Sequence, residues 1–303
     1  MTRPDDSSLT PAQYAVIRAQ AKRALREAGA LGRFPTNVAE IISISRAKEV
    51  HEDVLNESGF LAKLRKKAGS ALKSALSKVL GVFEAGSGLI FIDRSMLLVK
   101  QTFVRLHEAA HAFLPWQRPM YAVVEDCEHS LAPEVAELFD REANVFAAEV
   151  LFQLDAFSEE AEGEPFGIMT PVRLHKKYGA SIYASIRQYV SKNHRTCVVL
   201  VINPPTLVSG DGFRATLRRV VPSMRFAAQY LSVRWADSFT PDDEIGALIP
   251  IGKRRSSGKR RIELVDDNGV RHECIAEAFT QTRQVFVLIH VTHALTGATV
   301  LVA

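Results

Sequence analysis

The feature that most restricts how this chain can fold is the run HEAAH, which begins at His107 and ends at His111. Side chains four residues apart lie one above the other only on a helix, so both imidazoles can share one face of such a helix. Apolar residues one turn before and after place the two rings beside an apolar stripe. The sequence therefore predicts a helix over residues 97–114, ended by Pro115, with one face buried.

The same spacing predicts a metal site. Two ring nitrogens presented in this way can enter one tetrahedral zinc shell, and Glu108 between them lies beside the fourth, water-filled position. Zinc lowers the pKa of its water to about 7, and a neighbouring carboxylate can accept the proton. We therefore take His107 and His111 as metal ligands and Glu108 as the general base. The alternative, two unrelated histidines on a surface helix, agrees less well with the apolar stripe.

A third ligand is expected from a second helix, residues 133–154, which begins at Pro133. Glu142 is its best candidate because its neighbours one turn away are apolar: Leu138, Phe139, Val145 and Phe146. An ionised carboxylate on a buried face is costly unless a cation pairs with it. The alternative partner of Glu142 is a buried arginine. Asp140 is intermediate between the buried and the solvated face.

Residues 116–132, between the two helices, are expected to form a loop or broken structure. Tyr121 and His129 in this loop are candidates for stabilising the oxyanion of a tetrahedral intermediate.

The hydrophobic pattern of the remaining segments predicts mainly helices before residue 195 and mostly strands after it. Helical patterns cover 11–30, 36–50 with Thr36 as the N-cap, and 58–80. A strand is expected at 86–93, an acidic linker at 158–167, and a helix-turn-helix-like pair at 171–194 broken at Gly179. After residue 195 the pattern is mostly β, with strand-like runs CVVLVI, FRATLRRVV, RIELVD, HECIAEA and VFVLIHV and a further candidate, ATVLVA, at the end.

Composition restricts the class of protein further. The 303 residues carry a net charge of +4, concentrated in residues 65–78 and 253–261, and contain three scattered cysteines, too few for a disulfide framework. The opening residues are polar, and no apolar run reaches the ~20 residues of a membrane span. We expect a cytoplasmic protein without a membrane partner. Residues 253–261 are expected to be a solvated hairpin tip, so that binding to nucleic acid is an alternative but is not favoured.

The run HEAAHAFLP, followed about thirty residues later by DREANVFAAEVLF and preceded by GLIFID, resembles the ImmA/IrrE family of metallopeptidases. The resemblance extends over roughly residues 35–190. It implies that His107, His111 and Glu142 bind zinc, for which manganese is a possible substitute, and that Glu108 is the base. Asp140 stands where the family more often has Glu.

Together, the residue patterns and the resemblance lead us to expect an α+β protein with a helix-rich, zincin-like metallopeptidase domain and a small sheet at 35–160. An N-terminal helical extension (1–34) would precede this domain. A helix-turn-helix-like unit (165–195) and a smaller α+β domain (196–303), with a sensor or regulatory role, would follow it.

The implied function is that of a zinc endopeptidase of narrow specificity. Members of the family act on a helix-turn-helix repressor, and its cleavage would derepress stress-response or mobile-element genes. The alternative is a metal-bearing antirepressor or sensor that binds the repressor or DNA without proteolysis. Residues 171–194 would serve for docking or packing.

Overall fold

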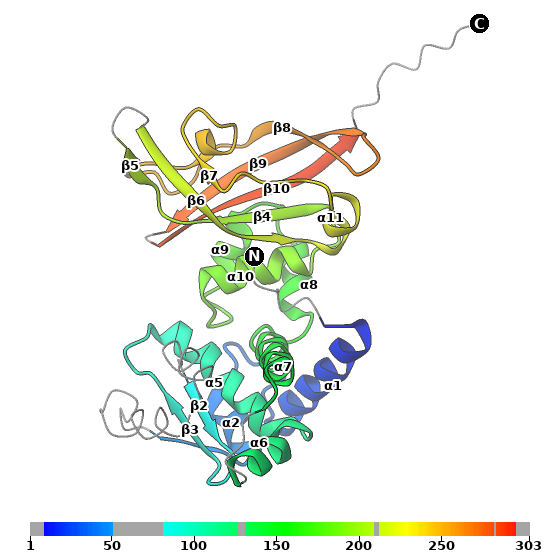
Figure 1. Cartoon of the computed structure of the whole chain (residues 1–303), viewed down its shortest axis with the longest axis vertical. Coiled ribbons are helices and arrows are strands. Elements are labelled where there is room, and N and C mark those ends of the chain that lie inside the picture. Colours follow the sequence, from blue (N-terminus) through cyan, green and yellow to red (C-terminus); the bar gives the residue numbers. More distant parts are fainter. Residues whose placement is uncertain (1–8, 51–80, 127–130, 209–211, 282, 295–303) are drawn as a thin grey trace, which may run out of the picture. The chain divides into compact units, whose positions relative to one another are not determined.

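The computed structural model describes residues 9–50, 81–126, 131–208, 212–281 and 283–294, in two compact units (Figure 1). The first unit comprises Met1–Phe157 and His175–Ser181, and the second comprises Ser158–Leu174 and Ile182–Ala303. The chain leaves the first unit at residue 157, earlier than the boundary near 195 that the change of texture suggests. The reason is that the helix of residues 182–191 packs against the sheet of the second unit and the helix of residues 169–174 packs against that helix.

The first unit is mainly helical. Among its described residues the helices are α1 (Pro11–Glu27), α2 (Val38–Ile44), α5 (Leu98–Phe113), α6 (Gln117–Asp126) and α7 (Pro133–Leu151). Helix α1 begins with a capping box, in which Thr10 and Gln13 satisfy each other's backbone N–H groups. Helix α7 packs against both α5 and α1, so these three helices form the centre of the unit.

A three-stranded sheet accompanies these helices, in the order β1 (Lys48–Glu49), β3 (Leu89–Ile92), β2 (Gly81–Glu84). Strand β3 pairs parallel to β1 and antiparallel to β2. The apolar run GLIFID contains this central strand, whose Ile90 and Ile92 are fully buried. Edge strand β2 contacts α5 and thereby lies beside the HEAAH residues.

Several expected elements differ in the structure. The N-cap of α2 is Asn37, whose Oδ1 accepts from the Ala39 N–H, whereas the Thr36 hydroxyl donates to the Val150 carbonyl at 3.1 Å. The helix expected over 36–50 ends at Ile44, and the chain continues into β1. Residues 116–132 contain helix α6. The first five residues of the expected linker at 158–167 belong to helix α8 (Ala156–Glu162). The helix expected over 58–80 and the run ATVLVA lie outside the described residues.

The second unit is built on a seven-stranded antiparallel sheet of order β5-β6-β4-β10-β9-β8, with β7 paired to β6. The strands are β4 (Cys197–Ile202), β5 (Thr206–Val208), β6 (Gly212–Pro222), β7 (Ser238–Phe239), β8 (Arg260–Val265), β9 (Arg271–Gln281) and β10 (Gln284–Ala294). The remaining elements are α9 (Met169–Leu174), α10 (Ile182–Ser191), α11 (Met224–Gln229) and the 3-10 turn η2 (Gly246–Leu248).

The central strand β4 explains the run CVVLVI. All six of its residues are buried, because one face contributes to an apolar cluster with α11 and η2 while α10 contacts the strand as well. A strand covered on both faces loses the alternation of apolar and polar residues. Between α9 and α10, Gly179 has φ +63°, which confirms the predicted break at this glycine.

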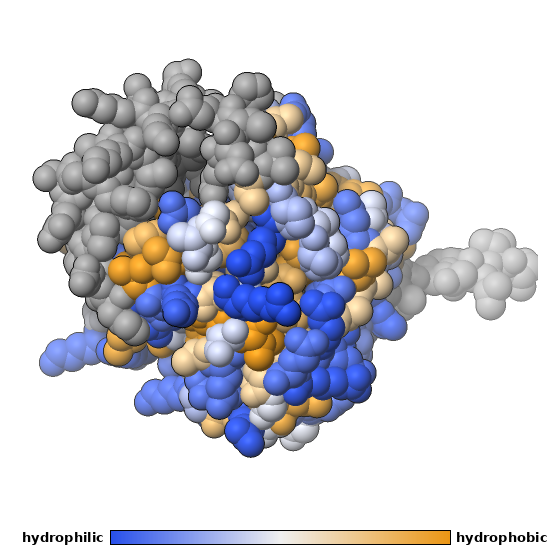
Figure 2. Space-filling model, turned by 90° about the horizontal axis from the view of Figure 1, so that it is seen from below, coloured by the Kyte–Doolittle hydropathy of each residue, from blue (hydrophilic) through white to orange (hydrophobic). Residues whose placement is uncertain are grey.

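No helix in the described part of the chain is long and apolar enough to cross a membrane. On the face shown in Figure 2, hydrophobic side chains lie in separate groups among hydrophilic ones. Such scattered apolar groups are ordinary for a protein surface.

Candidate metal centre

The contact between α5 and α7 brings three metal-ligating side chains together. His107 and His111 come from α5 and Asp140 comes from α7, and among the described residues these three form the one such group. The Nε2 atoms of the histidines are 3.1 Å apart, and each lies 3.9 Å from Asp140 Oδ1. The Asp140 side chain is 64% exposed, so the group is open to solvent on one side.

Both imidazoles are oriented by side-chain amides. His107 Nδ1 donates to Asn144 Oδ1 at 3.1 Å, and His111 Nδ1 donates to Gln117 Oε1 at 2.6 Å. Burial, followed by the charge of His107, lowers the pKa of His111 to about 3, so this ring is neutral at pH 7. A neutral imidazole with its proton on Nδ1 has its lone pair on Nε2. When both rings are neutral, their Nε2 lone pairs face each other across 3.1 Å, an arrangement that favours a cation between them.

The donor set fits zinc. Ligand atoms about 2.0 Å from a tetrahedral zinc lie roughly 3.3 Å apart, close to the 3.1 Å between the imidazole nitrogens. The longer 3.9 Å separations involve the exposed Asp140 carboxylate, which has room to move. Two nitrogens and one carboxylate oxygen, with one side open, match the ligand number of a catalytic rather than a structural zinc site.

Glu108 lies beside this group and against β2. Its side chain is buried, and its pKa is raised to about 8 by burial and by the charge of Asp140, while a hydrogen bond from the Phe83 backbone lowers it. The approach of β2 depends on Gly81. A Cβ there would lie 2.6 Å from Val104 Cγ1 and 2.9 Å from Glu108 Oε1, so only glycine allows this contact without displacement.

Glu142, the third ligand expected from the sequence, lies elsewhere. It is buried as predicted, but its Oε2 accepts from Trp116 Nε1 and from Gln117 Nε2, each at 2.7 Å. Positions 140 and 142 are about 200° apart around a helix, so they cannot face the same ligand set. The structure places Asp140 beside the histidines, and the buried Glu142 carboxylate is hydrogen-bonded by neutral N–H donors instead of a metal.

Of the two oxyanion candidates, Tyr121 lies on α6 with its ring packed edge-on to His111, at a centroid distance of 5.2 Å. Burial raises the pKa of its hydroxyl, with smaller contributions from Asp140 and Glu108, so the hydroxyl keeps its proton and remains a donor. His129 lies outside the described residues.

Two residues that orient the ligands were not anticipated. Asn144 follows Asp140 by four residues on α7, the same spacing that joins the two histidines, so this signal was present in the sequence. Gln117 offers no such signal, because its position depends on how α6 begins after Pro115.

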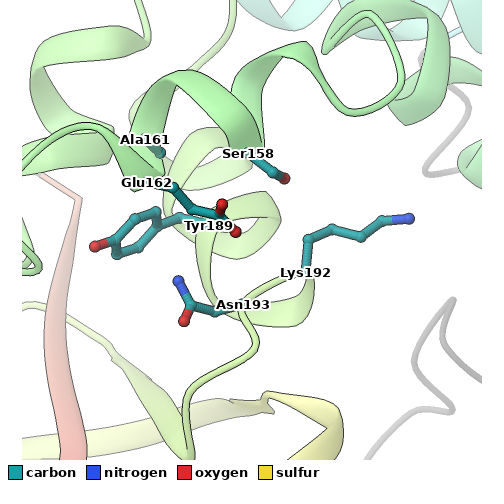
Figure 3. A pocket seen from close by; sticks show the side chains of 6 residues that line it. All are labelled: Ser158, Ala161, Glu162, Tyr189, Lys192 and Asn193. Carbon is teal, nitrogen blue, oxygen red and sulfur yellow. The ribbon is translucent and has the colours of Figure 1, made fainter.

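A small hollow in the second unit provides no comparable site (Figure 3). Its lining residues are Ser158, Ala161, Glu162, Tyr189, Lys192 and Asn193, and its volume of about 10 Å³ is that of a single water. In an adjoining hollow of about 210 Å³, His194 pairs with Glu162 at 3.3 Å, and Glu164 pairs with Arg173 at 2.8 Å. The α5–α7 group is therefore the candidate centre.

The helix pair α5–α7 brings together two imidazoles and a facing carboxylate, with a buried glutamate beside them. Residues 66–184 match the family Peptidase_M78, described as the IrrE N-terminal-like domain. These residues are therefore similar to an IrrE N-terminal-like domain, which confirms the resemblance to the ImmA/IrrE family. The matched residues include α5, α6 and α7, which carry the whole candidate centre.

A solved structure of a Mycobacterium tuberculosis transcriptional regulator is similar to this chain. The two share 12% sequence identity with a TM-score of 0.51, over 91% of this chain and 76% of the other. At this identity the likeness shows the fold alone, and it agrees with the expected α+β class. The comparison with curated proteins finds no match.

Proposed function

We propose that the protein is a zinc-dependent endopeptidase of narrow specificity. The observation that carries the proposal is the convergence of the His107, His111 and Asp140 ligand atoms beside the buried Glu108 carboxylate. A structural metal site has no need of an additional carboxylate at this place, whereas hydrolysis of a peptide bond needs a base there.

When bound, zinc would supply a Lewis acid that polarises the scissile carbonyl and acidifies the attacking water. In its ionised form Glu108 would accept a proton from the attacking water and return it to the leaving amine. His107 and His111 hold their lone pairs toward the metal position, since each donates its other ring N–H to an amide oxygen. The solvent-exposed side at Asp140 is where a peptide can approach.

Tyr121 is the candidate donor to the oxyanion because its ring packs against His111 and burial keeps its hydroxyl protonated. Loss of one such donor typically lowers kcat by about 10²–10³-fold. Tyr121→Phe is therefore expected to lower kcat by that factor while zinc affinity, measured by chelator competition, stays unchanged. An unaltered kcat would exclude this role.

The proposed substrate is a repressor of the helix-turn-helix type, with derepression of stress-response or mobile-element genes as the outcome. The resemblance to the ImmA/IrrE family supports this substrate, and the solved structure of similar fold is named a transcriptional regulator. Narrow specificity would come from docking of the whole repressor rather than from the few residues around the cleaved bond.

The test uses purified protein, zinc or manganese, and a helix-turn-helix repressor encoded by a neighbouring reading frame. The wild type is expected to cut the repressor into discrete fragments, and Glu108→Gln is expected to bind zinc but to cut at least about 10³-fold more slowly. Glu149→Gln, a change of another buried carboxylate on α7, is the matched control and should cut normally.

Two results would contradict the proposal. Cleavage by Glu108→Gln at the wild-type rate would remove the catalytic assignment. Release of the repressor from its DNA without any cut, equally by wild type and Glu108→Gln, would instead support a metal-bearing antirepressor.

A further inference from the structure

Glu142 and Gln117 form a buried hydrogen-bonded pair directly behind the metal centre. Glu142 Oε2 accepts from Gln117 Nε2 and from Trp116 Nε1, both at 2.7 Å. Gln117 has no exposed surface, and Glu142 is 6% exposed. Water therefore cannot replace either contact easily, and a lost partner leaves a buried polar atom unsatisfied.

The surroundings of Gln117 allow its amide only one orientation. On the Nε2 side lie two acceptors, Glu142 Oε2 at 2.7 Å and the Phe139 carbonyl at 3.3 Å. If the amide were turned over, its oxygen would face these two oxygens and its NH₂ group would face the His111 ring. An amide donates only through nitrogen and accepts only through oxygen, so the turned amide would lose its contacts with Glu142 and Phe139.

This orientation in turn determines the tautomer of His111. Gln117 Oε1 can only accept, so the ring proton of His111 must lie on Nδ1, 2.6 Å away. A neutral imidazole carries one N–H, and Nε2 therefore keeps its lone pair, 3.1 Å from His107 Nε2. We propose that Glu142 is a positioning residue that acts through Gln117 to hold His111 in the tautomer that ligates the metal.

The proposal rests on the proposed metal centre but not on peptidase activity. In this proposal Glu142 affects the metal ligand His111 through Gln117, without contacting His111 itself. If Glu142 is only a buried acid satisfied by two N–H groups, its removal should lower stability and leave the His111 ring unchanged. A positioning role and a purely structural role of Glu142 therefore predict different tautomers of His111 and different zinc affinities when Glu142 is replaced.

The first experiment measures the histidine tautomers by ¹⁵N NMR of the metal-free full-length protein. In the wild type, His111 is expected almost entirely as the Nδ1–H form. Glu142→Met, similar in length but without an acceptor, should show a mixture of both tautomers, whereas Glu142→Gln keeps an acceptor oxygen and should restore the Nδ1–H form.

The second experiment measures zinc affinity by chelator competition. Removing an outer-shell partner typically weakens metal binding by about 10–100-fold. Glu142→Met and Gln117→Leu should each show such a loss, and the double variant should lose no more than either alone, because the two residues act in one chain. Glu149→Met, at another buried carboxylate of α7, is the control and should retain wild-type affinity.

A folded Glu142→Met variant with wild-type zinc affinity and an unchanged Nδ1–H tautomer would overturn the proposal. If that variant does not fold, Gln117→Leu carries the same test, and wild-type zinc affinity in Gln117→Leu would overturn it equally. A wild type that binds no zinc would refute the proposed function, whereas the tautomers of the metal-free protein would still decide the role of Glu142.

Discussion

Each histidine of the candidate centre donates its outer ring N–H to an amide oxygen, Asn144 Oδ1 for His107 and Gln117 Oε1 for His111. An amide acceptor fixes the ring without adding a full negative charge beside it. The ligand set then carries the single charge of Asp140, which leaves a bound zinc with a net positive charge. Such a metal remains a strong Lewis acid, as hydrolysis requires.

The third position can be tested by exchanging single residues. A zinc site of four ligands contributes about 10–16 kcal/mol, so one ligand accounts for on the order of 3 kcal/mol, or roughly 100-fold in affinity. Asp140→Ala is expected to weaken zinc binding by this factor, with folding unaffected because the side chain is exposed. Glu142→Gln should bind zinc nearly as well as the wild type. If chelator competition shows weaker zinc binding by Glu142→Gln than by Asp140→Ala, Glu142 is the ligand instead of Asp140.

At the scale of the elements, α1 and α7 are joined through a buried carboxylate. Glu149 on α7 accepts from the Tyr14 hydroxyl and pairs with Arg18 at 2.8 Å, both on α1. Burial raises the pKa of Glu149 to about 7 even though Arg18 acts in the opposite direction. The cost of burying this charge therefore exceeds the attraction of the arginine, as is common for buried ion pairs.

The raised pKa of Glu149 predicts a pH dependence of stability. A carboxyl whose pKa rises on folding stabilises the fold below its unfolded value near 4.5, and this contribution is lost as pH rises through about 7. Glu149→Gln cannot ionise, so its free energy of unfolding relative to the wild type should increase by up to about 3 kcal/mol between pH 5 and 8. Urea unfolding across this range measures the difference. A difference for Glu149→Gln that stays flat across this pH range would contradict the assignment.

At the scale of the whole molecule, the chain returns to the first unit after it has entered the second. His175–Ser181 belongs to the first unit although Ser158–Leu174 belongs to the second. The returning segment inserts Tyr178, which is 1% exposed and packs edge-on against Phe34 and Phe157 at 5.0 and 5.1 Å between ring centroids. The first unit is therefore completed by residues that lie beyond its main boundary.

Removal of this ring should destabilise the first unit selectively. Deleting a fully buried aromatic side chain costs about 3–5 kcal/mol. Zinc stabilises the unit that binds it, so the unfolding transition of the first unit is the one that zinc shifts to higher denaturant concentration. Tyr178→Ala is expected to lower the free energy of unfolding measured for this transition by about 3–5 kcal/mol. Tyr183→Ala, in the second unit near Phe286, is the control. Equal effects of the two substitutions on the zinc-sensitive transition would contradict this division of the core.

The sequence by itself determined the features that depend on neighbours along the chain. The helix over 97–114, the helix that begins at Pro133 and the break at Gly179 are confirmed in α5, α7 and the turn before α10. The spacing of His107 and His111 places them on one helical face wherever that helix lies. The apolar runs of β4 and β10 could also be recognised in the sequence as strands, because strands in the centre of a sheet that is covered on both sides carry apolar residues on both faces.

Only the tertiary structure decided which carboxylate faces the imidazoles. Apolar neighbours correctly placed Glu142 on the buried face, but burial does not say whether a metal or an N–H group lies opposite. That depends on how α7 is rotated against α5, and two residues along a helix change the direction of a side chain by about 200°. The roles of Asp140 and Gln117 therefore arise from the packing of three helices, which no local spacing encodes.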